Sequence, residues 1–140
     1  MGSKIFLDAN ICLDFLLQRK GFEAADAIFE RIIKREVKAC ITPAIVHIIA
    51  YFSKKIHSVD TVKKILLKLL LHVEVIECSH EVTITAIASA MPDIEDALQY
   101  YTAIHHKVDY FVSHDKGLKK EAIPVLPVYS PDEFLGLFYN

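Results

Sequence analysis

The feature of this sequence that most limits its fold is the repeated alternation of short apolar runs with longer amphipathic segments. Residues 4–7 form a run too short for a helix, which stops at Asp8 and predicts a buried first strand. Similar runs at 39–41, 73–76 and 109–113 predict three more strands. A fifth is expected at 125–128, where two prolines restrict it to an edge or an end of the sheet.

The segments between these runs predict helices that begin at recognisable capping residues. In residues 22–36, apolar side chains recur at helical spacing while charged side chains take the other face. The expected helix starts are Asn10, Thr42-Pro43, Ser58 or Asp60, Ser79, Pro92-Asp93, and Ser130 with Glu133 as a capping box. Strands that alternate with helices in this way predict an α/β three-layer sandwich with a four- to five-stranded, mainly parallel sheet.

Length, charge and cysteine content narrow the class further. The 140 residues, 53% apolar and 24% charged, fit one globular domain over residues 1–140, with no repeat or linker to divide it. A net charge of −2 provides no global positive field, so a nucleic acid would have to be bound by local basic patches. Three distant cysteines suit neither a disulfide framework nor a zinc site, and no signal peptide or membrane span is visible. A reducing cytoplasm is the expected location.

Carboxylates gather where the predicted strands end. Asp8 follows the first strand, Asp115 follows the fourth, and Asp93 and Asp96 share one face at the start of a helix. Because ligands bind at the carboxyl ends of strands in such sheets, we expect these acids to converge and to hold one or two Mg²⁺ or Mn²⁺ ions. Such a site supports attack of water on a phosphodiester. The alternative is that Asp8 and the Asp93–Asp96 pair serve only as helix caps.

Three motifs in this order resemble a known family. They are Phe6-Leu-Asp8-Ala-Asn10, Pro92-Asp93-Ile-Glu-Asp96-Ala and Phe111-Val-Ser113-His-Asp115, and together they resemble the PIN domain, especially the VapC-type toxin ribonucleases of toxin–antitoxin pairs. The resemblance implies a Mg²⁺- or Mn²⁺-dependent site, an RNA substrate and an antitoxin partner. It implies that Asp8, Asp96 and Asp115 are the catalytic acids, that Asp93 is a further metal ligand, and that Asn10 and Ser113 support them.

One position departs from the family. The family usually has a Glu five residues after a Ser or Thr on the helix that follows the second strand. Here Thr42 keeps its place, but His47 stands where the Glu is expected. An imidazole can ligate or hydrogen-bond but cannot replace the negative charge, so His47 supports a rival hypothesis, a non-catalytic module of the same fold that binds RNA or a protein. The alternative for His47 is a partly buried helix residue.

Two rival classes with acids at strand ends do not fit. A haloacid-dehalogenase phosphatase needs Asp-x-Asp where this chain has Asp8-Ala-Asn10, and a response-regulator receiver needs an acceptor Asp where Glu77 follows the third strand.

Weaker signals concern the substrate and partner proteins. Lys116 and its lysine neighbours after Asp115 are candidates to meet RNA phosphates, although a solvated lysine-rich turn is the simpler interpretation. His114 is the best placed of the nearby histidines for a role in the chemistry. The segments 59–73 and 134–139 are more apolar than one packed face requires, which predicts a homodimer, an antitoxin contact or a deeply buried core.

Overall fold

The strands of this protein form one parallel sheet, in the order β3-β2-β1-β4-β5, in a computed structural model that describes residues 2–139. The strands are β1 (Lys4–Leu7), β2 (Lys38–Ile41), β3 (Val73–Val75), β4 (Tyr110–Val112) and β5 (Val128–Tyr129). In the central strand, Ile5 pairs with Ala39 on β2 and with Tyr110 on β4. The predicted α/β fold with a parallel sheet is confirmed.

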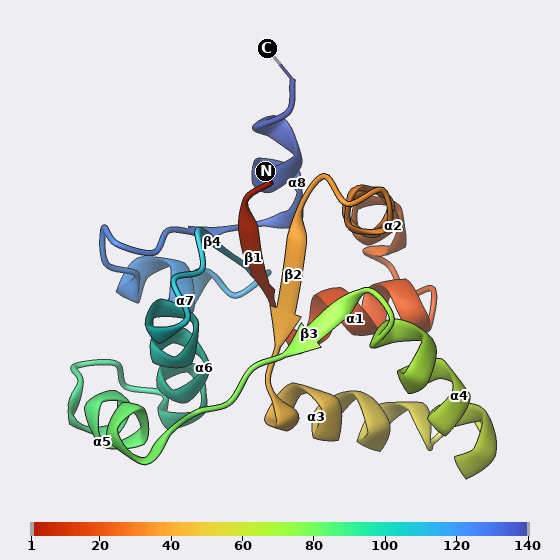
Figure 1. Cartoon of the computed structure of the whole chain (residues 1–140), viewed down its shortest axis with the longest axis horizontal. Coiled ribbons are helices and arrows are strands. Elements are labelled where there is room, and N and C mark those ends of the chain that lie inside the picture. Colours follow the sequence, from red (N-terminus) through yellow and green to blue (C-terminus); the bar gives the residue numbers. More distant parts are fainter. Residues whose placement is uncertain (1, 140) are drawn as a thin grey trace.

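Helices lie on both sides of this sheet (Figure 1). Figure 1 shows α5 (His80–Ala88), α6 (Ile94–His105) and α7 (Lys116–Glu121) on the left, with α1 to α4 on the right. The helices on the right are α1 (Ala9–Leu16), α2 (Phe22–Ile33), α3 (Pro43–Ser53) and α4 (Val59–Leu69), and α8 (Pro131–Gly136) packs against α2. The sheet is therefore covered on both faces, as strands buried on both sides require.

The centre of the core is a cluster of aromatic side chains between β1, β4 and α6. The rings of Phe6 and Phe111 stack with centroids 4.6 Å apart, and Tyr100 packs 5.9 Å from Phe111. The buried Tyr100 hydroxyl donates to the Leu126 carbonyl at 2.5 Å and accepts from the Ile123 amide at 2.8 Å. These contacts fix the β1–β4 pair, and with it the residues that follow each strand.

Three local predictions need correction. Asp8, not Asn10, caps α1, because the Asp8 amide still pairs with the Val112 carbonyl at 3.0 Å and so extends β1 by one residue. The lysine-rich segment after Asp115 is the helix α7 rather than a solvated turn. The fifth strand begins at Val128 instead of 125, because Pro127 has no amide hydrogen and contributes only its carbonyl, to Phe111.

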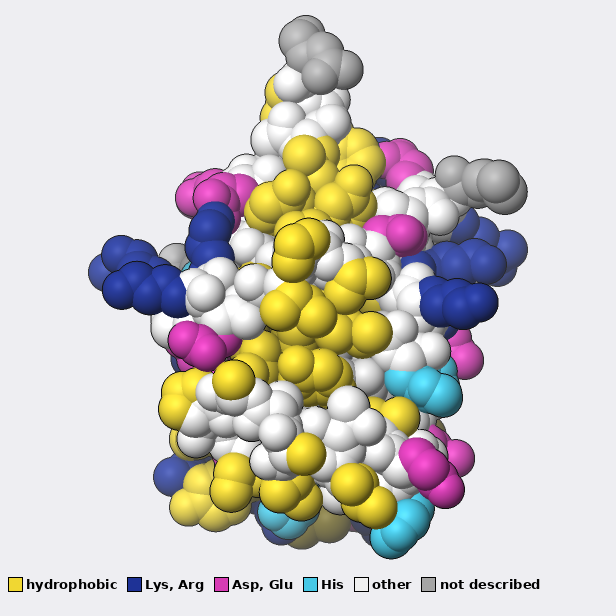
Figure 2. All heavy atoms as spheres, turned by 90° about the vertical axis from the view of Figure 1, so that its left-hand side faces the viewer, with side chains coloured by type: hydrophobic (Ala, Val, Ile, Leu, Met, Phe, Trp, Pro, Cys, Tyr) yellow, Lys and Arg dark blue, Asp and Glu magenta, His cyan; other side chains and the backbone are white. Residues whose placement is uncertain are grey.

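Apolar side chains are exposed on two faces. Figure 2 shows a band of hydrophobic side chains on the face formed by α5, α7 and the segment after α7, where Ile84, Ile87, Ile123 and Val125 are exposed. A second group lies on the α3–α4 side and includes Tyr51, Phe52, Ile56, Val59, Leu67 and Leu71. The leucine-rich segment is thus not a deeply buried core, since Leu71 is 77% exposed. No helix in residues 2–139 has both the length and the apolarity needed to cross a bilayer.

Candidate active site

The candidate site lies where the order of the strands reverses. Successive strands extend from β1 to β2 and β3 in one direction and from β1 to β4 and β5 in the other. Residues that follow β1 and β4 therefore meet at the carboxyl ends of these two neighbouring strands. In open parallel sheets, ligands bind at this place, where the connections leave in opposite directions. Asp8 and Ser113 are those residues.

A chain of hydrogen bonds links the two strand ends. The Ser113 hydroxyl donates to Asp8 Oδ2 at 2.7 Å and accepts from the Asp115 amide at 3.0 Å. Asp8 Oδ1 accepts from the Ala9 amide at 2.8 Å, and Asp115 Oδ1 accepts from the amides of Gly117 and Leu118 at 2.8 and 3.1 Å. Each carboxylate is thus held by the first turn of its own helix, with Ser113 between them.

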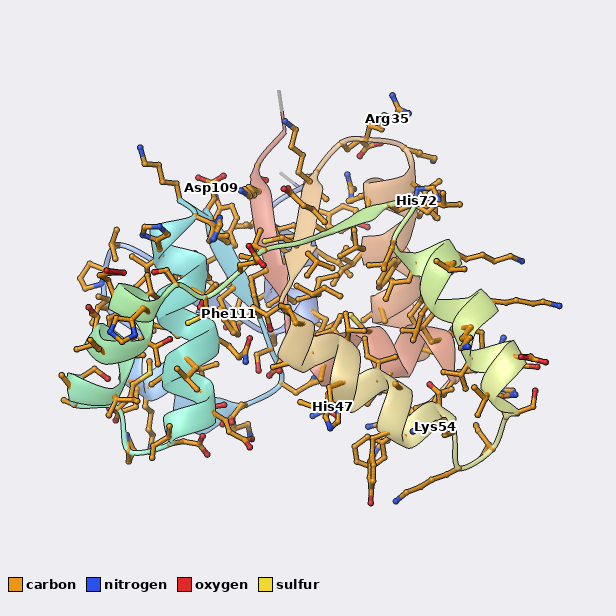
Figure 3. All side chains as sticks on the ribbon, turned by 60° about the horizontal axis from the view of Figure 1, so that its bottom comes forward. Arg35, His47, Lys54, His72, Asp109 and Phe111 are labelled. Carbon is orange, nitrogen blue, oxygen red and sulfur yellow. The ribbon has the colours of Figure 1, made fainter. Side chains whose placement is uncertain are left out.

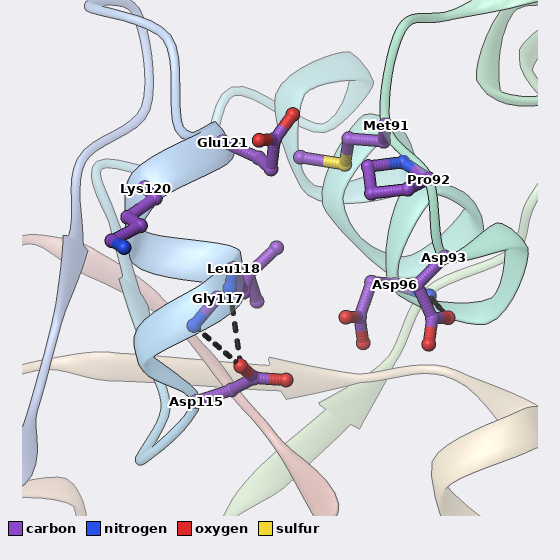
Figure 4. A pocket seen from close by; sticks show the side chains of 9 residues that line it. All are labelled: Met91, Pro92, Asp93, Asp96, Asp115, Gly117, Leu118, Lys120 and Glu121. Atoms are coloured by element: carbon purple, nitrogen blue, oxygen red, sulfur yellow. Dashed lines mark hydrogen bonds between the residues drawn. The ribbon is translucent and has the colours of Figure 1, made fainter.

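The start of α6 brings two further acids, Asp93 and Asp96, to the site. Asp93 Oδ1 caps this helix by accepting from the Asp96 amide at 2.9 Å. Asp93, Asp96 and Asp115 line one cleft of about 320 Å³, and Figure 4 shows Asp96 and Asp115 facing each other across it. The capping role expected as the alternative for Asp8 and Asp93 is therefore real, and it coexists with their convergence.

The charges in this cleft act on one another. The pKa of Asp96 is raised to about 6, first by burial and then by the negative charges of Asp93, Asp115, Asp8 and Glu95. This shift shows that all four predicted acids share one electrostatic environment. A bound cation would relieve their repulsion.

A pH-dependent stability follows from the raised pKa of Asp96. Its ordinary value is 3.8, so the ionised group destabilises the fold above about pH 6, and protonation relieves this as the pH falls from 6 towards 4. We expect Asp96→Asn to raise the Tm of the metal-free protein at pH 7.5 by about 2–4 °C, corresponding to about 1 kcal/mol after allowance for solvent screening. The gain should vanish near pH 4 in melts followed by circular dichroism. An equal gain at both pH values would contradict this.

The supporting residues are distributed around the site. Thr42 caps α3, and its buried hydroxyl hydrogen-bonds the side-chain oxygen of Gln99 on α6. Gln99 was not predicted, although it lies three residues after Asp96 and so on the same helix face. Asn10 is exposed on α1 and accepts from Arg19 at 3.3 Å rather than contacting the acids.

His47 and Lys116 lie at the periphery. His47 is exposed on α3, on the part of the molecule that Figure 3 turns toward the viewer, so the alternative of a partly buried helix residue is wrong. Lys116 opens α7 and lines a neighbouring cleft of about 780 Å³, together with Ser113, His114, Asp115, Lys119 and Lys120. Lys120 lines both this cleft and the carboxylate cleft, whereas Lys116 and Lys119 line only the neighbouring one.

The donor set fits a hard divalent cation. Oxygen ligands from carboxylates are what Mg²⁺ and Mn²⁺ prefer, and the raised pKa of Asp96 reflects an excess of negative charge where such an ion would sit. Among residues 2–139, no group of three or more His, Cys, Asp or Glu side chains is placed so that it could hold a metal ion without rearrangement. Asp8, Asp96 and Asp115 are the residues that would hold the ion, with Asp93 beside them.

Comparison with known proteins supplies the family context. The sequence profile of a family described as PIN domain matches residues 4–117. The fold is similar to the crystal structure of VapBC2 from Rickettsia felis bound to a DNA fragment from its promoter, with TM-score 0.67 and 18% identity over 91% of this chain and 98% of that one. It is also similar to PAE2754 from Pyrobaculum aerophilum, with TM-score 0.59 and 15% identity over 98% of this chain and 97% of that one. None of the curated proteins matches the chain.

Proposed function

The chain belongs to the PIN domain family, and on that premise we propose that it is a Mg²⁺- or Mn²⁺-dependent endoribonuclease, the toxin of a toxin–antitoxin pair. The observation that carries the proposal is that Asp96 and Asp115 line one cleft where the strand order reverses, with Asp8 tied to Ser113 beside it and its charge acting on Asp96. Carboxylates on rigid strand ends and helix starts are the means by which a protein holds a hard cation against a phosphodiester.

The chain's own residues would prepare the site for hydrolysis. A bound Mg²⁺ or Mn²⁺ supplies an activated water and stabilises charge on the leaving oxygen. Ser113 fixes Asp8 through its 2.7 Å hydrogen bond, and the α7 amides fix Asp115, so neither carboxylate has to be ordered when the ion and substrate arrive. Asp96 would contribute a charge that burial and its acidic neighbours make costly without the ion.

The direct test is cleavage of single-stranded RNA by the purified protein. We expect cleavage with Mn²⁺ or Mg²⁺, none with EDTA, and none of single-stranded DNA of the same sequence. A protein that binds RNA or a partner tightly but cleaves nothing under any of these metal conditions would favour the non-catalytic alternative, for which His47 is the main support.

Metal binding should also be visible without any substrate. A cation that binds the folded carboxylates and not the unfolded chain stabilises by mass action, about 2.7 kcal/mol at a hundredfold excess over Kd. For a chain of this size we expect Mn²⁺ to raise the Tm by about 5–10 °C, reversed by EDTA. The double variant Asp8→Asn with Asp96→Asn is the control. If this variant shows the same increase, the ion binds elsewhere.

His47 offers a gain-of-function test. The side chain is exposed on α3, so a carboxylate there meets no packing constraint and adds the charge that the family usually has. We expect His47→Glu to raise Mn²⁺ affinity by about tenfold, the scale on which groups around a metal tune it, and to increase cleavage. His57→Glu, the same change at another exposed histidine, should alter neither. Equal effects of the two variants would mean that only net charge matters.

The toxin proposal includes protein partners and a cellular location. The similar structure from Rickettsia felis is that of VapBC2 on promoter DNA, and we propose an antitoxin partner here by analogy. The exposed apolar side chains on α3–α4 and on α5–α7 support contacts with an antitoxin and with a second copy. Light scattering of the isolated chain should give a dimer mass. Three free thiols are in keeping with the reducing cytoplasm that we propose.

A further inference from the structure

Beside the carboxylate site, a buried acid holds a histidine that the proposed hydrolysis does not use. The Asp14 side chain, on the inner face of α1, is only 8% exposed. Its Oδ2 lies 3.0 Å from His114 Nε2, and its Oδ1 lies 3.4 Å from Arg19 Nε. A buried carboxylate is costly unless it is paired, so both oxygens of Asp14 are engaged by these two side chains.

The local backbone is shaped around this pair. Gln18 adopts a left-handed conformation, with φ of 50°, at the end of α1, and this returns the Arg19 amide to the Asp14 carbonyl at 3.1 Å. Gly21 then passes directly over the carboxylate, where a Cβ would lie 2.2 Å from Asp14 Oδ2 and 3.4 Å from His114 Nε2. The chain thus leaves no room beside the Asp14–His114 contact.

The Asp14 contact sets the hydrogen-bonding character of the His114 ring. A carboxylate can only accept, so Nε2 must carry the hydrogen, and in a neutral imidazole the other nitrogen, Nδ1, is then an acceptor. The His114 side chain is 45% exposed and lies between two clefts. One, of about 780 Å³, contains Asp115 and Lys116, and the other, of about 520 Å³, contains Arg19 and Lys20.

Resting on the proposed ribonuclease function, we propose that His114 is a specificity-determining residue that accepts a hydrogen bond from a ribose 2′-hydroxyl of the substrate, and that Asp14 is its positioning residue. His114 is adjacent to Ser113 and Asp115, so a nucleotide beside it neighbours the phosphate at the carboxylates. The lysines and Arg19 around both clefts suit the phosphates on either side. The 2′-hydroxyl, a donor that DNA lacks, is the group that an acceptor at this place would distinguish.

The test compares RNA with DNA in equilibrium binding, at pH 8 in the Asp96→Asn background. The probes are a labelled single strand of about 12 nucleotides, its DNA counterpart, and a series in which one ribose at a time is 2′-deoxy. We expect His114→Ala to weaken RNA binding about tenfold and DNA binding less than twofold, since one hydrogen bond is lost. At one position of the series, 2′-deoxy substitution should weaken binding to the background protein and leave binding to His114→Ala unchanged.

Asp14→Asn tests the positioning role. Arg19 Nε, 3.4 Å from Asp14 Oδ1, favours the asparagine oxygen on its side, so the amide nitrogen faces Nε2 and donates to it. This moves the ring hydrogen to Nδ1 and removes the acceptor, so the same loss of RNA preference is expected with the imidazole still present. His57→Ala should change neither affinity, and thermal melts confirm that each variant is folded.

The outcomes separate this inference from the proposed function. If RNA preference is equal with and without His114, or if RNA and DNA binding fall together, the 2′-hydroxyl role is overturned while metal-dependent cleavage can still stand. Absence of any RNA binding overturns it as well. If His114→Ala lowers RNA preference but the wild type never cleaves RNA, the inference holds and the nuclease proposal fails.

Discussion

Asp96→Asn is expected to lower metal-dependent RNA cleavage by about 10²- to 10³-fold, the cost of removing one preorganised charge from a site of this kind. Asp96 faces Asp115 across the cleft, and its pKa is raised to about 6, first by burial and then by the negative charges around it. An amide in its place keeps the shape but removes the charge that would hold the ion, so an ion and its water would be misplaced. Initial rates on a labelled RNA measure the effect.

A matched control is available on the opposite side of the sheet. Asp26 is exposed on α2, outside the clefts described above, so Asp26→Asn makes the same chemical change at a distance from the site. We expect its rate to equal that of the wild type. Cleavage that persists unchanged in Asp96→Asn would identify a contaminating nuclease as its source.

Phe111→Ala is expected to have the largest effect on stability, a loss of about 3–5 kcal/mol from a total of about 5–15 kcal/mol. Phe111 is 1% exposed, stacks on Phe6 at 4.6 Å and contacts Tyr100. Its removal leaves a cavity between β1, β4 and α6 that these rigid elements cannot close. Urea unfolding should show a lower midpoint at unchanged slope.

Phe111→Leu serves as the control, since it keeps most of the apolar volume and should lose only about 1–2 kcal/mol. A loss below about 1 kcal/mol in Phe111→Ala would mean that the aromatic cluster is not the centre of the core.

The elements that could be predicted from the sequence are those determined by residues close together in the chain. The run at residues 4–7 and the capping box at Ser130 and Glu133 are decided by neighbours within a few positions, and both occur as predicted. The cap of α1 was misassigned because Asn10 and Asp8 are both good caps. The choice between them is made by a strand-to-strand hydrogen bond from the Asp8 amide to Val112. The helix α7 is six residues long, too short to display a periodicity.

The acids of the site were predictable because they follow strands directly. The carboxyl ends of parallel strands meet at one edge whatever the details of packing, so Asp8, Asp96 and Asp115 could be grouped from their order in the chain. Gln99 and Asp14 could not, because their roles depend on how α3 packs near α6 and how the turn after α1 folds back. These contacts join residues 57 and 100 positions apart.

The long separation between β1 and β4 also determines when the residues of the candidate site can meet during synthesis of the chain. Asp8 is made 105 residues before its partner Ser113. At roughly 5–20 residues per second, translation takes about 5–20 s to cover that distance. Throughout that time a nascent chain has Asp8 but lacks Ser113 and Asp115. If the chain is the ribonuclease proposed above, its catalytic centre cannot assemble until Ser113 and Asp115 have been made, so the ribosome and messenger that produce it are spared an active nuclease throughout that interval.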